Sequence, residues 1–391
     1  MNKKAPTFSL KDQLFNREKI EYISRLISKS YPDFLQDNFI AEVVEEFPNL
    51  ELTQRITHIS EVLKKYLPED FEESVNILLE SLPEPDDNWT LDNNFGDFIF
   101  APFSEFVATY WLEDIDKNWL EFCLSALEKM TPNFSCEYSI RPFINTYEEE
   151  TLDRILEWSQ SDNYHVRRLA SEWSRPKLPW WKKINIDYRK CIKILDNLYC
   201  DDSRFVTRSV ANHLNDISKL DPELVVNTLK RWSSPQNSPQ GEGVAKDIDY
   251  IISHSTRWLV KQGHKETLEL LGYSSNPKVN IANLGIKNDI VKIWDSLEFE
   301  FELNPLLTSP HGRGIKQNLI IDYKIYFKNK SWVLKAKVFK IKKLILQKTI
   351  QITKKHPLKM MTTKALYEWE HQVEIIINWK SFWKKSFELK K

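Results

Sequence analysis

Basic, acidic and aromatic side chains gather between residues 163 and 181 of this 391-residue chain, in the stretch NYHVRRLASEWSRPKLPWW. Arg168 and Glu172 are four residues apart, so a helix places them on one face. The helix is expected to fail at Arg175, because Pro176 disfavours a helical conformation of its predecessor. A carboxylate held in this way can stabilise a growing positive charge, and a tryptophan face attracts cations. The alternative is a surface ion pair, worth at most about 1 kcal/mol, followed by a proline-rich corner.

The pattern of this stretch returns 40 residues later, where residues 202–212 align with residues 162–172. A period of about 40 residues is typical of HEAT repeats, which are stacked pairs of helices. The alignment places Arg208 at the position of the arginine and Asn212 at that of the glutamate. Arg208, Asn212 and Asp216 then share one polar helix face. We expect a polar stripe on the inner, concave side of the repeats. The alternative is hydrogen bonding that interlocks adjacent repeats.

Residues 165–180 closely resemble the signature of the AlkC-type DNA glycosylases, in which a V-R-R-L-A-S-E helix runs into an R-P-(R/K)-L-P-W turn. Upstream, residues 135–143 resemble the S-E-F-A-I-R-P-F element of the same family. This element carries Glu137 and Arg141, which are also four residues apart. The chain departs from the family pattern at Trp173, where the family usually has glycine, so the site is crowded if this side chain points inward.

The resemblance implies a DNA glycosylase that excises small cationic N-alkylated bases from duplex DNA, 3-methyladenine and 3-methylcytosine among them, by hydrolysis of the N-glycosidic bond. It implies that the duplex is bent to expose the lesion and that the base does not enter a deep pocket, unlike in most glycosylases. By the same resemblance, the reaction needs no metal or cofactor, and the catalytic residues are Glu137, Glu172 and Trp180. The expected DNA contacts in the helical part are Arg168, Arg208, Asn212 and Arg141.

The formal net charge of −1 conceals a steep gradient along the chain. Residues 1–162 carry a net charge of −19, residues 163–272 carry +5 and residues 273–391 carry +13. A polyanion is therefore expected to bind the C-terminal two thirds and to be repelled by the N-terminal third. The candidate phosphate contacts in the most basic segment are Lys335, Lys337 and Lys340. The alternative is an acidic, solvated helical surface with a lysine-rich tail that aids solubility.

Two patterns of apolar residues divide the chain into an all-α part and an all-β part. In residues 8–160, apolar residues recur at spacings of three and four between prolines, which predicts amphipathic helices. Past the last helical pattern, alternating runs such as residues 297–303 predict six or seven short strands. We expect a multidomain protein with a HEAT-like repeat α-solenoid in residues 1–273 and an immunoglobulin-like β-sandwich in residues 277–391. The C-terminal part also resembles the Ig-like domain of the AlkC-type family.

The sequence lacks the patterns of membrane, secreted and zinc proteins. No apolar run is long enough to span a bilayer and no signal peptide is recognisable, so a cytoplasmic, nucleoid-associated protein is expected. The four cysteines form no C-x-x-C motif and the eight histidines form no H-E-x-x-H motif, which indicates no zinc site. We expect a monomer that binds double-stranded DNA with alkylated bases. Two alternatives stay open, a non-catalytic HEAT-repeat scaffold on damaged or bent DNA and a protein-binding HEAT adaptor.

Overall fold

The computed structural model describes residues 9–85, 95–111, 119–178, 184, 186–234, 242–306, 316–328, 333–359 and 366–390. Trp180, a predicted catalytic residue, lies outside the described residues, so its position relative to the glutamates stays a prediction. The chain divides into two compact units, one formed by Met1–Asp221 with Arg231–Ser255 and the other by Pro222–Lys230 with Thr256–Lys391.

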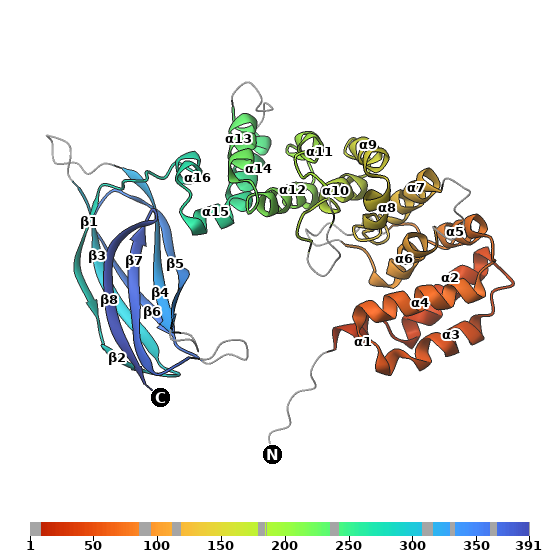
Figure 1. The fold of residues 1–391 in the computed structure, drawn as a ribbon, viewed down its shortest axis with the longest axis horizontal. Coiled ribbons are helices and arrows are strands. Elements are labelled where there is room, and N and C mark those ends of the chain that lie inside the picture. The colour runs from red at the N-terminus through yellow and green to blue at the C-terminus, as the bar shows by residue number, and fades with distance from the viewer. Residues whose placement is uncertain are drawn as a thin grey trace, which may run out of the picture. The chain divides into compact units, whose positions relative to one another are not determined.

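Helices succeed one another from the N-terminus to Leu270, in the order shown in Figure 1. They are α1 (Leu10–Leu14), α2 (Arg17–Ser30), α3 (Gln36–Glu45), α4 (Leu52–Tyr66), α5 (Phe71–Glu80), α6 (Ala101–Tyr110), α7 (Leu120–Met130), α8 (Arg141–Thr146), α9 (Glu148–Trp158), α10 (Tyr164–Glu172), α11 (Ile192–Leu198), α12 (Arg204–Ile217), α13 (Pro222–Trp232), α14 (Glu242–Ser255), α15 (Arg257–Gln262) and α16 (Lys265–Leu270), with the short 3₁₀ helices η1 (Phe47–Asn49) and η2 (Phe98–Phe100).

The ends and faces of these helices follow from local sequence. At the start of α2, the Asn16 side chain accepts a hydrogen bond from the backbone N–H of Lys19 at 3.0 Å, which satisfies one of the free donors of the first turn. Ile20, Ile23 and Ile27 recur at spacings of three and four, and all three are fully buried. Burial of each such side chain stabilises the packed helix by about 1.5–3 kcal/mol. The predicted amphipathic helices of this region are thus confirmed.

The two copies of the 40-residue repeat begin at equivalent positions. Asn163 precedes α10 and Ser203 precedes α12, and the two helices pack against each other. The Asn163 side chain accepts a hydrogen bond from the backbone N–H of His165 at 2.8 Å. The repeat therefore aligns the starts of two neighbouring helices.

Helix α10 ends earlier than its proline predicts. Its last residue is Glu172, three residues before Arg175. Trp173 follows, and its side chain is fully buried. The indole N–H donates to the carbonyl of Ala170 at 3.0 Å, so the ring packs into the core beneath the helix end. The bulky residue that replaces the usual glycine therefore fills the core.

Eight strands are described in the C-terminal part, and they form two sheets in the orders β1-β3-β6 and β2-β8-β7-β4-β5. They are β1 (Val279–Ile286), β2 (Ile290–Lys292), β3 (Ser296–Pro305), β4 (Gln317–Lys328), β5 (Leu334–Leu346), β6 (Ile350–Pro357), β7 (Trp369–Ile377) and β8 (Lys380–Lys390). Alternate residues of β3 and β4, among them Phe299, Phe301, Tyr323 and Ile325, form the buried core of this part. An all-α part followed by a β-sandwich is confirmed.

The last hairpin joins β7 to β8 through the two residues Asn378 and Trp379. Both have positive φ, 46° and 68°, which is typical of the type I′ turn that matches the twist of antiparallel strands. Ile377 pairs with Lys380 directly beside the turn. Alternation did not predict β8, because lysine and serine interrupt its apolar positions in KSFWKKSFELK.

Candidate active site

Arg168, on α10, lies between the two glutamates of the sequence motifs. Its Nη1 donates to Glu137 Oε2 and to Ser135 Oγ, both at 2.5 Å, while Nη2 lies 3.7 Å from Glu172 Oε2. The side chains of Arg168 and Glu172 are each only 5% exposed. The structure thus brings Glu137, Glu172 and Arg168 together. The pair on α10 is buried, so its interpretation as a surface ion pair is wrong.

Two phenylalanines enclose the guanidinium group of Arg168. Its Cζ lies 5.1 Å from the ring centre of Phe95 and 4.8 Å from that of Phe205. The two rings meet edge to face, with their centres 5.7 Å apart. Each ring face attracts the cation and excludes water, which strengthens the attraction between arginine and carboxylates. Phe95 lies outside every motif, and Phe205 lies in the second copy of the repeat, where nothing in the sequence predicted a contact with Arg168.

Glu172 has a hydrogen-bond donor at each of its carboxylate oxygens. Arg175 Nη1 donates to Oε1, and Ser209 Oγ donates to Oε2 at 2.6 Å. Burial by itself raises the pKa of Glu172, but the charges of Arg168 and Arg175 and the hydroxyl of Ser209 outweigh burial and hold the pKa below its usual value. Glu172 is therefore a buried carboxylate whose surroundings favour the ionised form and whose two oxygens both accept hydrogen bonds from the protein.

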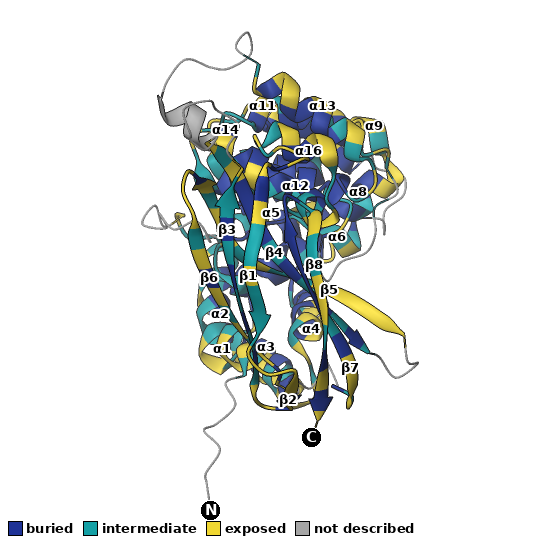
Figure 2. Ribbon diagram, turned by 90° about the vertical axis from the view of Figure 1, so that its left-hand side faces the viewer, coloured by how far each residue is buried: buried dark blue, intermediate teal, exposed yellow. Residues whose placement is uncertain are grey.

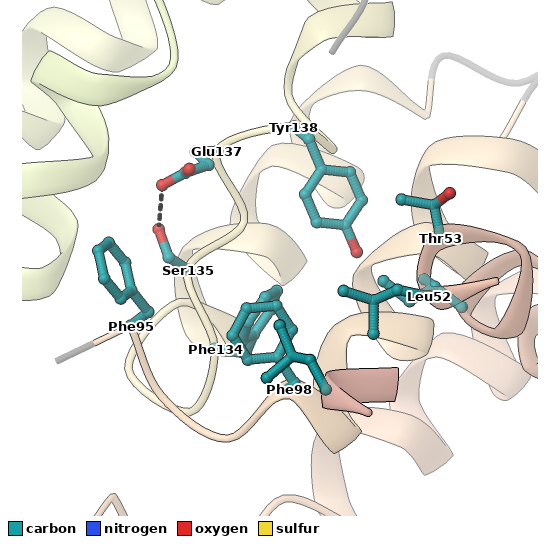
Figure 3. A pocket seen from close by; sticks show the side chains of 10 residues that line it. Leu52, Thr53, Phe95, Phe98, Phe134, Ser135, Glu137 and Tyr138 are labelled. Carbon is teal, nitrogen blue, oxygen red and sulfur yellow. Dashed lines mark hydrogen bonds between the residues drawn. The ribbon is translucent and has the colours of Figure 1, made fainter. Parts of the chain in front are cut away.

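Glu137 differs from Glu172 in having an open oxygen. Its side chain is 18% exposed, and both Ser135 Oγ, at 3.0 Å, and Arg168 donate to the same atom, Oε2. Figure 3 shows the bond to Ser135. Within the described part of the chain, Oε1 accepts no hydrogen bond. This oxygen is the carboxylate atom of the cluster that is best placed to meet water or a substrate.

Arg175 ties α10 to α12 across the seam between the repeats. Its Nε and Nη2 donate to Asp216 Oδ2 at 3.0 and 2.9 Å, while its Nη1 reaches Glu172. On the same seam, Nδ1 of the buried His213 lies 2.9 Å from the carbonyl of Ser171, so this nitrogen carries the proton. Asp216, expected on a polar stripe along the inner, concave side, is buried and binds Arg175 from the neighbouring repeat. Interlocking of adjacent repeats by hydrogen bonds, the alternative interpretation, is therefore confirmed here.

His213 is held neutral by its surroundings. Burial lowers its pKa to about 4, and the positive charge of Arg175 acts in the same direction. A second cation beside Arg175 would weaken the buried network. A neutral imidazole adds a hydrogen bond without adding charge.

Arg141, a predicted DNA contact, is buried. Its Nη2 donates to the carbonyls of Trp173 and Arg175 at 3.2 and 2.9 Å. Burial lowers its pKa to about 10, so the side chain still carries its charge at neutral pH. The guanidinium satisfies carbonyls that the end of α10 leaves free. We correct the expectation for Arg141 accordingly, because this residue braces the turn after α10 and does not face solvent.

Arg208 and Asn212, the other expected DNA contacts on α12, are both half-buried. Asn212 Oδ1 lies 3.0 Å from His254 Nε2, which joins α12 to α14. Arg208 Cζ lies 5.9 Å from the ring centre of Phe205, the same ring that covers Arg168. Asn212 thus takes part in repeat packing, whereas Arg208 lies beside the carboxylate cluster.

The three candidate lysines lie on β5, whose residues are exposed over most of its length (Figure 2). They do not share one face. Lys335 pairs with Phe327 and Lys337 with Ile325, and both partners point into the sandwich core. Residues directly opposite on antiparallel strands lie on the same face, so Lys335 and Lys337 extend from the inner face. Lys340 pairs with Asp322 and lies on the outer face.

The described residues contain no group of three or more His, Cys, Asp or Glu side chains that could hold a metal ion. Burial raises the pKa of the thiols of Cys123, Cys136 and Cys191 to about 12, so they stay protonated and unreactive at neutral pH. No described helix is long and apolar enough to cross a membrane.

Known proteins resemble this chain over both the helical part and the sandwich. The family model "DNA alkylation repair enzyme" matches residues 109–241, and the model "Uncharacterised protein YhaZ, C-terminal Ig-like domain" matches residues 280–391. YhaZ of Bacillus subtilis (strain 168) is 32% identical over 372 residues, which cover 94% of this chain and 95% of YhaZ. The alkylpurine DNA glycosylase AlkC of Pseudomonas fluorescens, solved bound to DNA containing an abasic site analog, is 30% identical with a TM-score of 0.82, covering 98% of this chain and 100% of AlkC.

These matches span both the helical part and the sandwich. The first family model includes Glu137, Arg168 and Glu172, and the second covers the described strands from Asn280 onward. The chain therefore belongs to the AlkC-type family of DNA alkylation repair enzymes, in which a helical repair part precedes an Ig-like domain.

Proposed function

We propose that this protein is a DNA glycosylase that hydrolyses the N-glycosidic bond of small cationic N-alkylated bases in duplex DNA, with 3-methyladenine as its main substrate and 3-methylcytosine as another. The supporting observation is the pair of carboxylates bridged by Arg168, in which Glu137 keeps an open oxygen. Similarity to the DNA-bound alkylpurine DNA glycosylase AlkC supports the reaction class.

The reaction needs a leaving base, a water molecule and negative charge beside the sugar. An N-alkylated purine is cationic, so it leaves without being protonated. As its bond to C1′ breaks, the electron pair goes to the base, which becomes neutral, and positive charge grows on the sugar. Glu137 Oε1 stabilises this charge and accepts a proton from the water whose oxygen bonds to C1′.

Glu172 was expected to be catalytic and Arg168 to contact DNA, but both are buried and paired within the protein, so we propose that they position Glu137 for this reaction. Arg168 Nη1 fixes Oε2 of Glu137, which leaves Oε1 directed to its open side. Glu172 anchors the other end of the guanidinium and balances its charge. A planar guanidinium with donors at fixed angles suits this bridging role, and lysine does not replace it. Trp180, which closes the motif, is proposed to contact the cationic base through its ring face.

DNA binding is proposed to use Arg208 and the β5 lysines. Lysine contacts with phosphate confer affinity without sequence preference, which suits an enzyme that must find lesions anywhere. Arg208 lies beside the same phenylalanine that covers Arg168, so it is proposed to hold a phosphate close to the lesion.

The deciding experiment measures release of free base from N-methylated duplex DNA by the purified full-length protein. We expect 3-methyladenine to be released by the wild type and by Glu157→Gln, a control whose side chain is 69% exposed, but not by Glu137→Gln. A gel shift on the same DNA separates the alternatives. A non-catalytic scaffold binds the DNA and releases no base, and a protein-binding adaptor does neither.

A further inference from the structure

The guanidinium group of Arg168 lies in a corner made by two phenylalanine rings from distant parts of the helical unit. Phe205 is the second residue of α12 and is buried, whereas Phe95 precedes η2 and is 37% exposed. The two ring planes meet at 71°, and the guanidinium carbon lies over both ring faces. Two faces at this angle restrict the movement of the cation in two directions.

The polar contacts of Arg168 do not fix the plane of its guanidinium group. Nη1 donates to Ser135 and Glu137, whereas Nη2 lies 3.7 Å from Glu172, which is too far for a hydrogen bond. Within the described part of the chain, Nη1 is the only nitrogen of this group that donates a hydrogen bond. A guanidinium held at one nitrogen can pivot about it. The ring faces therefore set its plane, and they attract the cation more strongly because water is excluded.

Phe95 is fixed by the same backbone bridge that fixes Ser135. The carbonyl of Phe95 accepts a hydrogen bond from the backbone N–H of Ser135 at 2.9 Å, and Figure 3 shows the two residues next to each other. Gly96 pairs with Phe134 in an antiparallel bridge. Its φ of 83° favours glycine, and a Cβ atom there would clash with the carbonyl group of Asn133. One wall of the corner is thus held together with the segment that carries the candidate catalytic carboxylate.

Phe205 brings the other wall from the next repeat. Its helix, α12, packs against α10, which carries Arg168. The Phe205 ring also meets the ring of His165, in the first turn of α10, edge to face with the ring centres 6.1 Å apart. The packing of two repeats therefore determines where this ring lies, and the ring in turn determines how the guanidinium is oriented.

We propose that Phe95 and Phe205 are positioning residues of the glycosylase reaction, which hold the plane of the Arg168 guanidinium and thereby direct the open oxygen of Glu137 toward the substrate. Neither ring supplies a proton or a charge. Without them the guanidinium pivots about Nη1, and the carboxylate bound to that nitrogen turns with it. A displacement of about 1 Å at a reacting group can cost on the order of a hundredfold in rate. The inference rests on the proposed function.

The test compares Phe205→Leu, Phe95→Leu and Phe71→Leu in the full-length protein. Leucine keeps an apolar side chain but removes the ring face. Phe71 is the matched control, because it is similarly buried, begins helix α5 and packs against the rings of Phe106 and Trp119. We expect single-turnover release of 3-methyladenine per folded molecule to fall at least tenfold in the first two variants, with affinity for methylated duplex DNA within twofold of the wild type. Phe71→Leu should lower the melting temperature and leave the rate per folded molecule unchanged.

A conservative variant separates the ring face from general packing. Phe95→Tyr keeps the ring, and its hydroxyl can reach solvent because this wall is partly exposed. It should excise within threefold of the wild type, whereas Phe95→Leu should not. The proposal is overturned if Phe95→Leu and Phe205→Leu excise within twofold of the wild type, or if Phe95→Tyr loses as much activity as Phe95→Leu.

An NMR measurement on the side chain of Arg168 makes this inference fail separately from the proposed function. Protons that lie over a ring face resonate upfield, and the Arg168 signal is assigned by its absence in Arg168→Lys. We expect Phe205→Leu to move the Nε–H signal downfield and to speed rotation about the Nε–Cζ bond, and Phe71→Leu to change neither. An unchanged Arg168 signal in Phe205→Leu refutes the positioning role, whatever the excision assay shows. A changed signal in a protein whose wild type releases no base refutes only the glycosylase.

Discussion

Replacing Glu172 by glutamine tests whether the buried Glu172 or the partly exposed Glu137 carries the proposed reaction. The substitution keeps the size of the side chain but removes the negative charge that faces Arg168 and Arg175. Both arginines stay buried, and removal of one partner from a buried ion pair costs about 3–5 kcal/mol. For a helical unit of this size, the melting temperature should fall by on the order of 10 °C. An exposed pair would lose at most about 1 kcal/mol.

Glu137→Gln is the matched comparison, because it changes the same chemical group in the same cluster. Its side chain is partly exposed, and the glutamine carbonyl can still accept hydrogen bonds from Ser135 and Arg168. The expected loss of stability is about 1.5–3 kcal/mol, the scale of hydrogen bonds to charged groups. Excision of 3-methyladenine per folded molecule should fall by roughly two to four orders of magnitude, the scale of lost electrostatic and general-base catalysis.

The two variants should therefore rank in opposite order for stability and for activity. Glu172→Gln should lose more stability, and Glu137→Gln should lose more activity per folded molecule. Thermal melting, affinity for duplex DNA and single-turnover base release, measured on one preparation of each variant, decide the matter. The reasoning is refuted if Glu172→Gln melts like the wild type, or if Glu137→Gln excises as fast as Glu172→Gln.

Three further predictions concern pH and charge. The pKa of His213 is about 4 in the folded protein against about 6.5 unfolded, so its stabilising effect is complete above pH 6.5 and is lost toward pH 4. The wild type should lose about 3 kcal/mol more of its unfolding free energy than His213→Gln over this range, and equal pH profiles would contradict the assignment. Burial raises the pKa of Asp322 from 3.8 to about 6, so its charge opposes folding fully above pH 6, and this effect declines as the pH falls and is gone near pH 3.8. Asp322→Asn should then melt higher than the wild type at pH 8 but not at pH 4, and a lower melting point at pH 8 would refute this. If the inner face of β5 contacts DNA, reversing the charges of Lys335 and Lys337 should weaken DNA binding. The slope of log affinity against log salt concentration should also become shallower by about two, one for each lost phosphate contact. Reversal of Lys340 tests the outer face alone, and unchanged affinity in both variants would exclude β5 from the interface.

The relation between Arg168 and Glu172 was predictable because it is local. Residues four apart on one helix are neighbours whatever the rest of the fold does. Ser135 and Glu137 come from a separate segment, and their approach to Arg168 depends on how that segment folds back on α10. Spacing along a helix does not show how far a side chain is buried, so the burial of Glu172 became clear only from the structure.

In the sandwich, too, features set within one strand were predictable, and features set by pairing between strands were not. Alternation in residues 297–303 predicts β3 correctly, because each apolar residue there points into the core. The arrangement of lysines on β5 could not be predicted in this way. A register irregularity between Ile321 and Asp322 of β4 and the pairing across the two strands determine which lysine extends from which face.

The site is part of the seam that holds two repeats together, and this has a consequence for its chemistry. Glu172 receives Arg175 from the turn after its own helix and Ser209 from the next repeat. Asp216 receives the other side of Arg175. The charges of Glu172, Arg175 and Asp216 are thus each neutralised by a partner, which is what burial requires. Both oxygens of Glu172 already accept a hydrogen bond from the protein. The network opens at Glu137, where Arg168 and Ser135 both donate to one oxygen and no described residue donates to the other. That second oxygen is the one assigned to the proposed reaction, while Glu172 serves repeat packing.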